Sequence, residues 1–440
     1  MFSPEFFIKA TQLLLSLSIL IALHELGHFI PARIFGCRVE KFYLFFDIKY
    51  SLFKKKIGET VYGIGWLPLG GYVKISGMID ESFDKEQMEK PPQPWEFRSK
   101  PSWQRLIIML GGVTVNLLLG FFIYMMVLFV WGKETLPQEN IPLGLEPSAF
   151  IQEIGFDKGD KIIDVDGEKL DFVLDINRML LLRPVEKVKV EKLDGSISEI
   201  DIPENIGNDI FQSGQISSFT PIYSATIDSV FSDSPALYAG MQSGDIIVSV
   251  NGQSIYDWGD FSNWIGNNSD DIINVEVQRR SSIYKLNIDR NDDGTIGVLR
   301  RNEIKTINKK LNISESIVQG FNYGYWTLYE YVAGFSFVFT KKGASQLGGF
   351  GTIGNIFPAK WDWKGFWLST ALISIILAFM NVLPIPALDG GHVMFLVYEM
   401  ISGRKPSDKF MEVSTMIGFF ILIAIVLYAN GNDIVRAFAN

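Results

Sequence analysis

The three histidines of this 440-residue chain all lie in two short motifs whose residue types could hold a metal ion. Residues 24–28 read H-E-L-G-H, and residues 388–392 read L-D-G-G-H. On a helix, residues four apart share a face, so His24 and His28 can both reach one ion. Glu25 lies beside that pair, where it could take a proton from a water on the ion. The first motif therefore predicts a metal-dependent hydrolytic site.

The second motif supplies a candidate third ligand, Asp389. It follows an apolar run that two prolines, Pro384 and Pro386, interrupt. Two histidines and an aspartate, with one position left for water, form the layout of a catalytic zinc site. From the residues alone His392 is a rival third ligand, and Asp389 could instead only cap the helix that follows it.

A structural alternative also exists for the first motif. His24 and His28 could be hydrogen-bonded inside a helix bundle without any metal. Glu25, buried beside them, would then need a partner of its own, because an unpaired buried carboxylate is strongly disfavoured. The metal interpretation explains all three residues together.

The composition is that of a membrane protein. Hydrophobic residues make up 48% of the chain, and the mean hydropathy is +0.18. Four apolar runs are long enough to cross a bilayer, so we expect four transmembrane helices. The runs are Ala10–Phe29, Leu106–Trp131, Phe366–Leu383 and Met411–Tyr428. The first lacks a small-residue cleavage site and carries the metal motif, so it is not interpreted as a signal peptide.

Basic residues predict the orientation of these helices. They cluster after the first span, before the second and after the third, all on one side of the membrane, which the positive-inside rule assigns to the cytoplasm. They are Arg33, Arg38, Arg98, Lys100, Arg105, Arg404 and Lys405. The first and third spans run in the same direction, so both metal motifs reach the same depth near the cytoplasmic face. The segment Gly132–Lys364 is then expected outside.

Charge and cysteine content exclude other classes. The net charge of −9 gives no basic surface for nucleic acid. The single cysteine, Cys37, cannot form an internal disulfide. A thiolate ligand is possible in principle, but we expect Cys37 to be a small buried apolar residue.

The segment Val39–Gly77 predicts short strands. It alternates aromatic and polar residues and is rich in glycine, most clearly in Gly58–Ile75. A strand edge beside the metal could pair with an extended substrate backbone. The alternative is a cytoplasmic hairpin with no substrate role. The polar stretch Asp80–Pro94 is predicted to be a flexible linker.

The outer segment contains an internal repeat. Residues 155–160 read G-F-D-K-G-D and residues 240–245 read G-M-Q-S-G-D; each is followed by a buried-strand pattern and then by D-G or N-G, a hairpin turn. The pattern resembles bacterial PDZ domains in tandem. The second copy also carries Ser234-Pro235-Ala236, which the first lacks. The alternative is any small β-rich domain with hairpins.

After the repeats, Ile313–Thr340 is aromatic-rich and predicted to be helical. We expect an amphipathic helix on the outer membrane surface. Packing against the outer domains is the alternative.

Together these features closely resemble the site-2 protease family of intramembrane zinc metalloproteases. The resemblance covers nearly the whole chain, and the combination is highly specific. It rests on H-E-x-x-H, P-L-G-G-Y-V-K at 68–74, Asn116 in the second helix, the two repeats, and N-x-x-P-x-P-x-L-D-G at 381–390.

The resemblance implies that His24, His28 and Asp389 bind one zinc ion per chain and that Glu25 is the catalytic acid/base. It implies that His392 is not a ligand. It further implies that Asn381 holds the substrate backbone beside a membrane-embedded β loop. Further candidate substrate-binding residues are Gly63, Gly65 and Asn116. Two departures loosen nearby turns only: Gly111-Gly112 stands where relatives often carry Gly-Pro, and 348–351 reads G-G-F-G.

The predicted fold is an α+β membrane protein with four transmembrane helices, a membrane-associated β loop, and two extracytoplasmic PDZ-like domains between helices 2 and 3. The expected segments are 1–38 (first helix), 39–80 (β loop), 81–102 (cytoplasmic linker), 103–132 (second helix), 133–215 and 216–300 (PDZ-like domains), 301–364 (interfacial region), 365–400 (third segment) and 401–440 (fourth helix and tail).

The expected function is hydrolysis of peptide bonds within the transmembrane segments of single-span proteins in a bacterial inner membrane, for instance anti-sigma factors or remnant signal peptides. The outer repeats would exclude substrates with bulky outer domains. A membrane-tethered PDZ scaffold without catalysis is one alternative, but it has no use for Glu25. A zinc transporter is another, but the four spans show no repeat symmetry.

Overall fold

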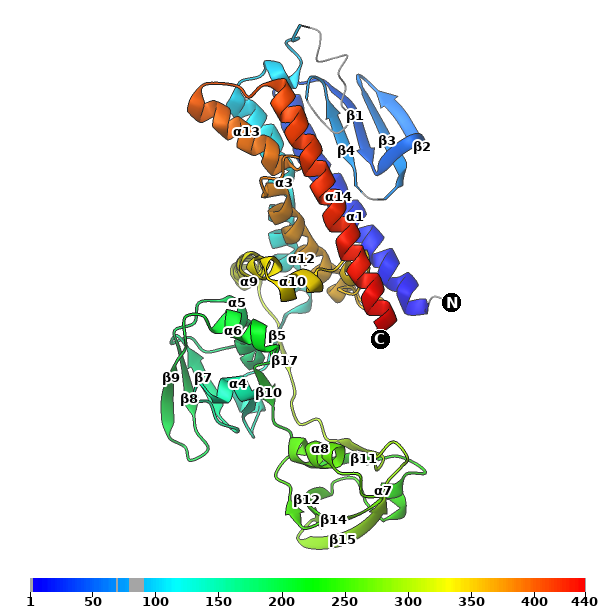
Figure 1. Cartoon of the computed structure of the whole chain (residues 1–440), viewed down its shortest axis with the longest axis vertical. Coiled ribbons are helices and arrows are strands. Elements are labelled where there is room, and N and C mark those ends of the chain that lie inside the picture. Colours follow the sequence, from blue (N-terminus) through cyan, green and yellow to red (C-terminus); the bar gives the residue numbers. More distant parts are fainter. Residues whose placement is uncertain (1–2, 69, 79–90, 440) are drawn as a thin grey trace. The chain divides into compact units, whose positions relative to one another are not determined.

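The computed structural model describes residues 3–68, 70–78 and 91–439. The chain divides into two compact units, the first formed by Met1–Gly132 and Lys310–Asn440 and the second by Lys133–Lys309. Figure 1 shows long helices and one sheet in the first unit, and small sheets with short helices in the second. Much of the predicted linker, residues 81–90, lies outside the described residues.

Within the described residues, four helices of the first unit are long and apolar enough to cross a membrane, as the sequence predicts. They are α1 (Pro4–Ile34), α3 (Ser102–Trp131), α12 (Trp363–Val382) and α14 (Asp408–Ala439). At 1.5 Å per residue even the shortest, α12, extends about 30 Å, which is the thickness of the hydrocarbon core. The chain is a multi-pass membrane protein.

Local signals set the ends of these helices. The Ser3 hydroxyl accepts a hydrogen bond from the backbone N–H of Phe6 at the start of α1, and the Asp362 carboxylate caps α12 in the same way. The helix α12 ends at Val382, two residues before Pro384, since proline disfavours helical backbone in the residue before it.

Small residues let α3 pack closely against its neighbours. Gly27 of α1 and Gly111 of α3 face each other so closely that a Cβ on either would overlap the backbone carbonyl of the other. At Gly120, a Cβ would lie 2.8 Å from Cγ1 of Ile375 in α12. Contacts between small residues are typical of helix packing in membranes. The helix α3 therefore contacts both of the helices that lead into the metal motifs.

The described part of the first unit also contains other helices. They are η1 (Phe97–Ser99), α9 (Ile313–Phe335), η4 (Ser336–Phe339), α10 (Lys341–Gln346), α11 (Phe350–Gly354) and α13 (Asp389–Ser402). A capping box between Asn312 and Glu315 begins α9. This helix packs on α3, where the rings of Tyr124 and Tyr323 lie 4.6 Å apart. Its position at the membrane surface stays a prediction.

A four-stranded sheet follows α1, as the pattern in this segment predicts. Its strands are β1 (Val39–Leu44), β2 (Phe46–Ile57), β3 (Thr60–Leu67) and β4 (Tyr72–Ile75), in the order β2-β3-β1-β4. Strands β1 and β3 are parallel, and the other pairs are antiparallel. The two edges of the sheet are therefore β2 and β4.

The second unit holds two hydrophobic cores, one for each repeat. The first is built from β6 (Leu145–Pro147), α4 (Ala149–Gln152), β7 (Lys161–Val165), η3 (Val173–Asp175), α5 (Ile176–Leu182), β8 (Lys187–Glu191), β9 (Ile197–Asp201), α6 (Ile206–Ser213) and β10 (Phe219–Pro221). The strand β10 pairs with β6, so this core extends to Phe219, beyond the expected boundary at 215.

The second core is built from β11 (Ile227–Val230), α7 (Pro235–Tyr238), β12 (Ile246–Val250), β13 (Gln253–Ser254), α8 (Trp258–Asn267), β14 (Ile272–Arg279), β15 (Ser282–Asp289) and β16 (Val298–Arg300). The unit begins with β5 (Lys133–Thr135) and η2 (Gln138–Asn140) and ends with β17 (Ile307–Lys309). Because β5 pairs with β17, the chain enters and leaves this unit at adjacent points.

The repeated sequence forms the same local structure twice. Asp166-Gly167 and Asn251-Gly252 both have positive φ at the two positions, the geometry of a type I′ hairpin turn. The turns before β7 and β12 each contain glycines with positive φ, among them Gly159 and Gly244. The hairpins predicted from D-G and N-G are thus confirmed.

Candidate metal centre

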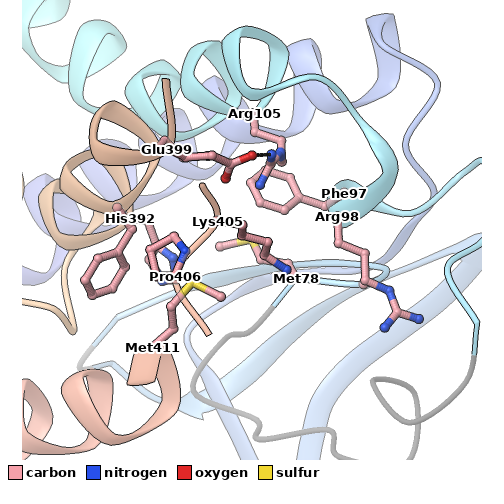
Figure 2. A pocket seen from close by; sticks show the side chains of 12 residues that line it. Met78, Phe97, Arg98, Arg105, His392, Glu399, Lys405, Pro406 and Met411 are labelled. Atoms are coloured by element: carbon pink, nitrogen blue, oxygen red, sulfur yellow. Dashed lines mark hydrogen bonds and ion pairs between the residues drawn. The ribbon is translucent and has the colours of Figure 1, made fainter. Parts of the chain in front are cut away.

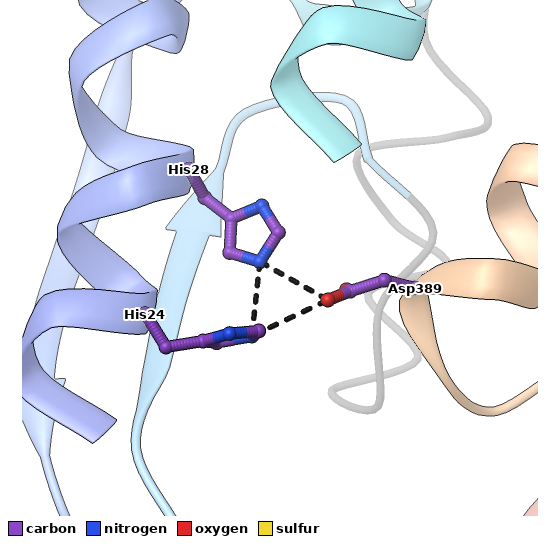
Figure 3. Close-up of side chains that lie close together, drawn as sticks. All are labelled: His24, His28 and Asp389. Carbon is purple, nitrogen blue, oxygen red and sulfur yellow. Dashed lines mark hydrogen bonds and ion pairs between the residues drawn. The ribbon is translucent and has the colours of Figure 1, made fainter. Parts of the chain in front are cut away.

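The helix α1 places both histidines of the first motif on one face. The two imidazoles, of His24 and His28, lie with their Nε2 atoms 3.2 Å apart, and neither ring is exposed (Figure 3). The small Gly27 between them lets α3 approach this part of α1. The four-residue spacing of His24 and His28 therefore directs one nitrogen atom of each ring toward the same point.

The aspartate of the second motif reaches that point from α13. Oδ2 of Asp389 lies 3.3 Å from Nε2 of His24 and 3.3 Å from Nε2 of His28 (Figure 3). The N-cap of α13 is Leu388, and Asp389 is its first helical residue. The alternative in which Asp389 serves as the helix cap is therefore wrong.

The backbone between α12 and α13 sets the position of the carboxylate. The prolines at 384 and 386 separate the helices, and a tight turn closes with a hydrogen bond from the N–H of Leu388 to the carbonyl of Ile385. A Cβ at Gly390 would overlap the backbone of Val382, and one at Gly391 would overlap Pro386. The two glycines after the aspartate are thus required for α13 to begin so close to the end of α12.

The three side chains have the geometry of a zinc site. Within the described part of the chain, His24, His28 and Asp389 form the one group of histidine, cysteine or acidic residues close enough to share an ion. Ligand atoms about 2.0–2.1 Å from a tetrahedral zinc lie roughly 3.3 Å from one another, and the observed separations are 3.2, 3.3 and 3.3 Å. Oδ2 of Asp389 is buried and makes no hydrogen bond. The donor set fits zinc and leaves one position of a tetrahedral ion unassigned.

Glu25 is buried beside this set and has only 9% of its surface exposed. Its side chain also lies next to the sheet: a Cβ at Gly71, the residue before β4, would be 3.4 Å from Cγ of Glu25. The edge strand β4 therefore begins next to the carboxylate that the first motif places by the metal.

The structure separates His392 from the metal group. It lies one helical turn after Asp389 and lines a pocket with Phe97, Arg105, Glu399 and Met411, among others (Figure 2). Arg105 and Glu399 form an ion pair in this pocket. Of the two candidate third ligands that the sequence offers, Asp389 and not His392 therefore lies near both His24 and His28.

The candidate substrate-binding residues lie in different settings. Asn116 is 1% exposed, with its amide 3.3 Å from Nδ1 of His24. Asn381 is half-buried near the end of α12. A Cβ at Gly63 would overlap the Tyr43 ring, and one at Gly65 would overlap the backbone of Phe46, so packing within the sheet already requires both glycines.

Sequence reasoning missed two contacts of the site. The backbone carbonyl of Ile108 accepts a hydrogen bond from Nδ1 of His28, and Gly112 lies against both imidazoles. A carbonyl leaves no side-chain signal, but Gly111-Gly112 inside an apolar run was an available clue to close helix packing. Cys37 is buried and free, as expected.

Comparison with known proteins gives the same picture. The family model described as Peptidase family M50 matches residues 12–425. The regulator of sigma-E protease RseP from Salmonella typhimurium is 27% identical over 96% of this chain and 97% of its own length. The regulator of sigma E protease from Haemophilus influenzae is 26% identical over 96% of this chain and 98% of its own. A Campylobacter jejuni protein, named as a zinc metalloprotease, is 28% identical over 96% and 92%. This chain therefore belongs to peptidase family M50, the site-2 proteases, and is a zinc metalloprotease.

Proposed function

We propose that this protein cleaves peptide bonds inside the membrane, in the transmembrane segments of single-span proteins, with one zinc ion held by His24, His28 and Asp389. The observation that carries the proposal is the triangle of three ligand atoms 3.2–3.3 Å apart, next to Glu25, inside a set of membrane-spanning helices. Ionisable groups at that depth are expensive to bury, so a functional role is their best explanation.

The chemistry divides between the ion and the carboxylate. When bound, zinc would supply Lewis acidity: it lowers the pKa of a bound water to about 7 and polarises the scissile carbonyl. Glu25 would act as the general base and acid, accepting a proton from the attacking water and returning it to the leaving amine. The burial of Glu25 keeps it close to the histidines and away from bulk water.

A substrate helix must unwind before it can react, because its carbonyls are hydrogen-bonded to its own backbone. We propose that the edge strand β4 receives the unwound segment by strand pairing. In support, β4 is one edge of the sheet and Gly71, just before it, lies against Glu25. Asn381 is the proposed contact to the substrate backbone from α12.

We place this site toward the cytoplasm and the second unit outside, on the basis of the basic residues near the helix ends. Cysteine accessibility tests this orientation: Ser407→Cys is expected to label from the cytoplasmic side and Ser196→Cys from the outer side. Both positions are exposed. Cys37 is buried, and Cys37→Ala provides a background without the native thiol. Labelling from the opposite sides would reverse the assignment.

We propose that the second unit, read as two PDZ-like domains, restricts which substrates reach the site. Its ends are joined by the β5–β17 pair, where the Thr135 hydroxyl donates to the Ile307 carbonyl. Residues 136–306 can therefore be replaced by a short Gly-Ser linker with little strain on the first unit. The deletion should allow cleavage of substrates with large outer domains; unchanged selectivity would argue against a filter.

The decisive test of the proposal is Glu25→Gln in the full-length protein. We expect cleavage of a single-span model substrate to be lost while zinc content stays near the wild-type level, because the variant removes the base and keeps all three ligands. A control variant, Glu59→Gln, changes an exposed carboxylate at the hairpin turn and should cleave normally. Full activity in Glu25→Gln would rule out the proposed mechanism.

The identity of the substrate is a further part of the proposal. We expect anti-sigma factors or remnant signal peptides among the substrates, in keeping with the names of the relatives. The inactive Glu25→Gln variant should retain uncleaved substrates, which mass spectrometry after purification can identify. Recovery of soluble proteins alone would contradict this substrate class.

A further inference from the structure

One face of α3 contacts both histidines of the metal set. Ile108, Gly112 and Asn116 are spaced four residues apart, so they form a stripe along one side of the helix. Nδ1 of His28 lies 2.8 Å from the carbonyl oxygen of Ile108. Nδ1 of His24 lies 3.3 Å from the side-chain amide of Asn116. The two ends of the stripe, Ile108 and Asn116, thus each contact one imidazole.

The contact to Ile108 fixes the protonation of His28. A carbonyl oxygen can only accept a hydrogen bond, so Nδ1 of His28 must carry the proton. In the neutral ring that metal binding requires, Nε2 then presents its lone pair toward His24 and Asp389. Because the bond is to the backbone, it does not depend on the side chain at position 108.

Gly112 holds the middle of the stripe at contact distance. A Cβ there would lie 2.6 Å from Cε1 of His24 and would overlap Nε2 of His28. The absence of a side chain lets the α3 backbone lie against both rings. This contact limits how far either imidazole can rotate out of the plane in which its nitrogen faces Asp389.

We propose that this stripe of α3 positions the two histidine ligands, and that Asn116 is the positioning residue of His24 and not a substrate contact. The proposal rests on the zinc site proposed above. For His24 to bind through Nε2, its proton must lie on Nδ1, which then needs an acceptor. The Asn116 side chain lies within reach of Nδ1 and can supply that acceptor.

The amide of Asn116 is suited to this role. Its oxygen and nitrogen are interchangeable by a half-turn, so the hydrogen-bond partners decide which faces His24. In the structure the amide nitrogen Nδ2 of Asn116 is the atom 3.3 Å from Nδ1 of His24. The proposal requires the half-turn of the amide that brings Oδ1 to this place, because only the oxygen can accept from Nδ1–H. With 1% of the residue exposed, a substrate could reach Asn116 only after the helices separate.

A second bond holds Asn116 at this height. The hydroxyl of Ser374, fully buried in α12, donates to the backbone carbonyl of Asn116 at 2.6 Å. The helix that leads to Asp389 is thereby tied to the residue of α3 that contacts His24. The ligands from α1 and α13 are therefore both positioned through contacts with α3, which helps to keep the two motifs at the same level along the helices.

The test measures zinc affinity in the full-length protein by competition with a chelator, alongside the visible absorption of the cobalt-substituted form. Asn116→Leu is nearly isosteric and removes the acceptor; we expect zinc to bind about 10- to 100-fold more weakly, with an altered cobalt spectrum. Asn116→Asp keeps an acceptor oxygen and should restore both properties to within a few-fold of wild type.

Two controls separate this effect from general damage to the helix bundle. Thr370→Val removes a buried hydroxyl that bonds only within α12, to the carbonyl of Phe366. Leu118→Ala changes an exposed residue of α3. Both should bind zinc as the wild type does. Wild-type zinc affinity and cobalt spectrum in Asn116→Leu would overturn the proposal. If the KM of that variant were raised as well, Asn116 would be a substrate contact instead.

A measurement on the unmodified protein covers the case in which Asn116→Leu does not fold. The chain has only three histidines, so a spectrum of ¹⁵N-histidine protein loaded with zinc contains three imidazoles, and His392→Gln identifies one. We expect protonated Nδ1 and metal-bound Nε2 for both His24 and His28. Binding of His24 through Nδ1 would overturn the proposal. A wild-type protein that binds no zinc would instead refute the proposed function.

Discussion

The two units of this protein bury aspartates in opposite ways. In the second unit, Asp245 is fully buried and both of its oxygens accept from the Arg279 guanidinium, at 2.7 and 2.8 Å. In the first unit, Asp389 faces two histidines, and among the described residues no lysine or arginine forms an ion pair with it. A buried carboxylate needs a compensating charge, and Arg279 provides one at every pH at which the protein is stable. At Asp389 a metal ion held together with the two imidazoles would supply that charge.

The first repeat shows that the pattern in the second unit is structural. Asp160 occupies the position that Asp245 occupies in the second repeat, and Lys192 donates to it at 2.8 Å. Both aspartates also accept from a backbone N–H three residues earlier in their turn. The cation thus closes the G-x-x-x-G-D turn in each copy. The lesson is that the counter-charge, more than burial, distinguishes a structural aspartate from a metal ligand.

The largest effect that this comparison predicts is at Asp389. Asp389→Asn keeps the shape of the side chain and removes its charge, so zinc should bind more than about 100-fold more weakly, beyond the range for the loss of an outer contact. Cleavage should fall to background with little change in the stability of the second unit. Chelator competition measures the zinc affinity, and a cleavage assay measures the activity. Retained zinc would show that Asp389 is not a ligand and would contradict the comparison with Asp245.

The corresponding change in the second unit should affect stability alone. Asp245→Asn removes the charge that Arg279 contacts through two hydrogen bonds, and a hydrogen bond to a charged group typically contributes about 1.5–3 kcal/mol. Pulse proteolysis of the full-length protein in urea reports the unfolding of this unit. Zinc content should be unchanged, and Asp160→Asn should have a smaller effect, because Lys192 contacts only one oxygen. Loss of zinc in either variant would contradict the comparison.

The two repeats should also differ at alkaline pH. Burial acts to lower the pKa of Lys192, but its bonds to Asp160 and Asp157 outweigh burial and raise the pKa above its usual 10.5. The stabilisation is therefore complete below pH 10.5 and is lost as the pH rises through the folded-state pKa. The pKa of Arg279, which is ordinarily higher than that of lysine, is raised further, first by its bond to Asp245.

We therefore expect the first repeat to become sensitive to an alkaline-active protease at a lower pH than the second. Cleavage-site mapping from about pH 9 to about pH 12 measures the order. Lys192→Arg should remove the difference, since arginine keeps its charge across this range. Simultaneous loss of both repeats in the wild type would show that these ion pairs do not set the order.

The smallest predicted effect is at His392. It lies one helical turn from Asp389 but faces the pocket with Arg105 and Glu399. His392→Gln should leave zinc affinity within about twofold of wild type, well below the effect of losing an outer contact to a ligand. A loss of zinc affinity as large as that of Asp389→Asn would instead indicate that His392 is a zinc ligand.

The sequence predicts much of this structure because its strongest patterns are local. Long apolar runs predict the four spans, and D-G and N-G predict the two hairpins. Periodicity within one helix places His24 near His28. The proximity of Asp389 to both depends on two helices from opposite ends of the chain, and from the residues alone His392 remained a rival.

Other features depend on contacts that leave no residue signal. The Ile108 bond uses a backbone carbonyl, and the start of α13 at Asp389 depends on the close approach of Gly390 and Gly391 to the preceding turn. The packing of α9 on α3 uses aromatic residues whose composition equally suits a membrane surface. In each case the sequence allowed several arrangements with similar local energies, and tertiary packing selected one.

X-ray absorption of the zinc-loaded, full-length protein tests the central claim most directly. The account predicts one zinc per chain with two imidazole nitrogens and a carboxylate oxygen at about 2.0–2.2 Å. The chain offers only one cysteine and three histidines, so the alternatives are distinct. A sulfur ligand would implicate Cys37, a third imidazole would implicate His392, and either result, like the failure to retain zinc, would contradict the site described here.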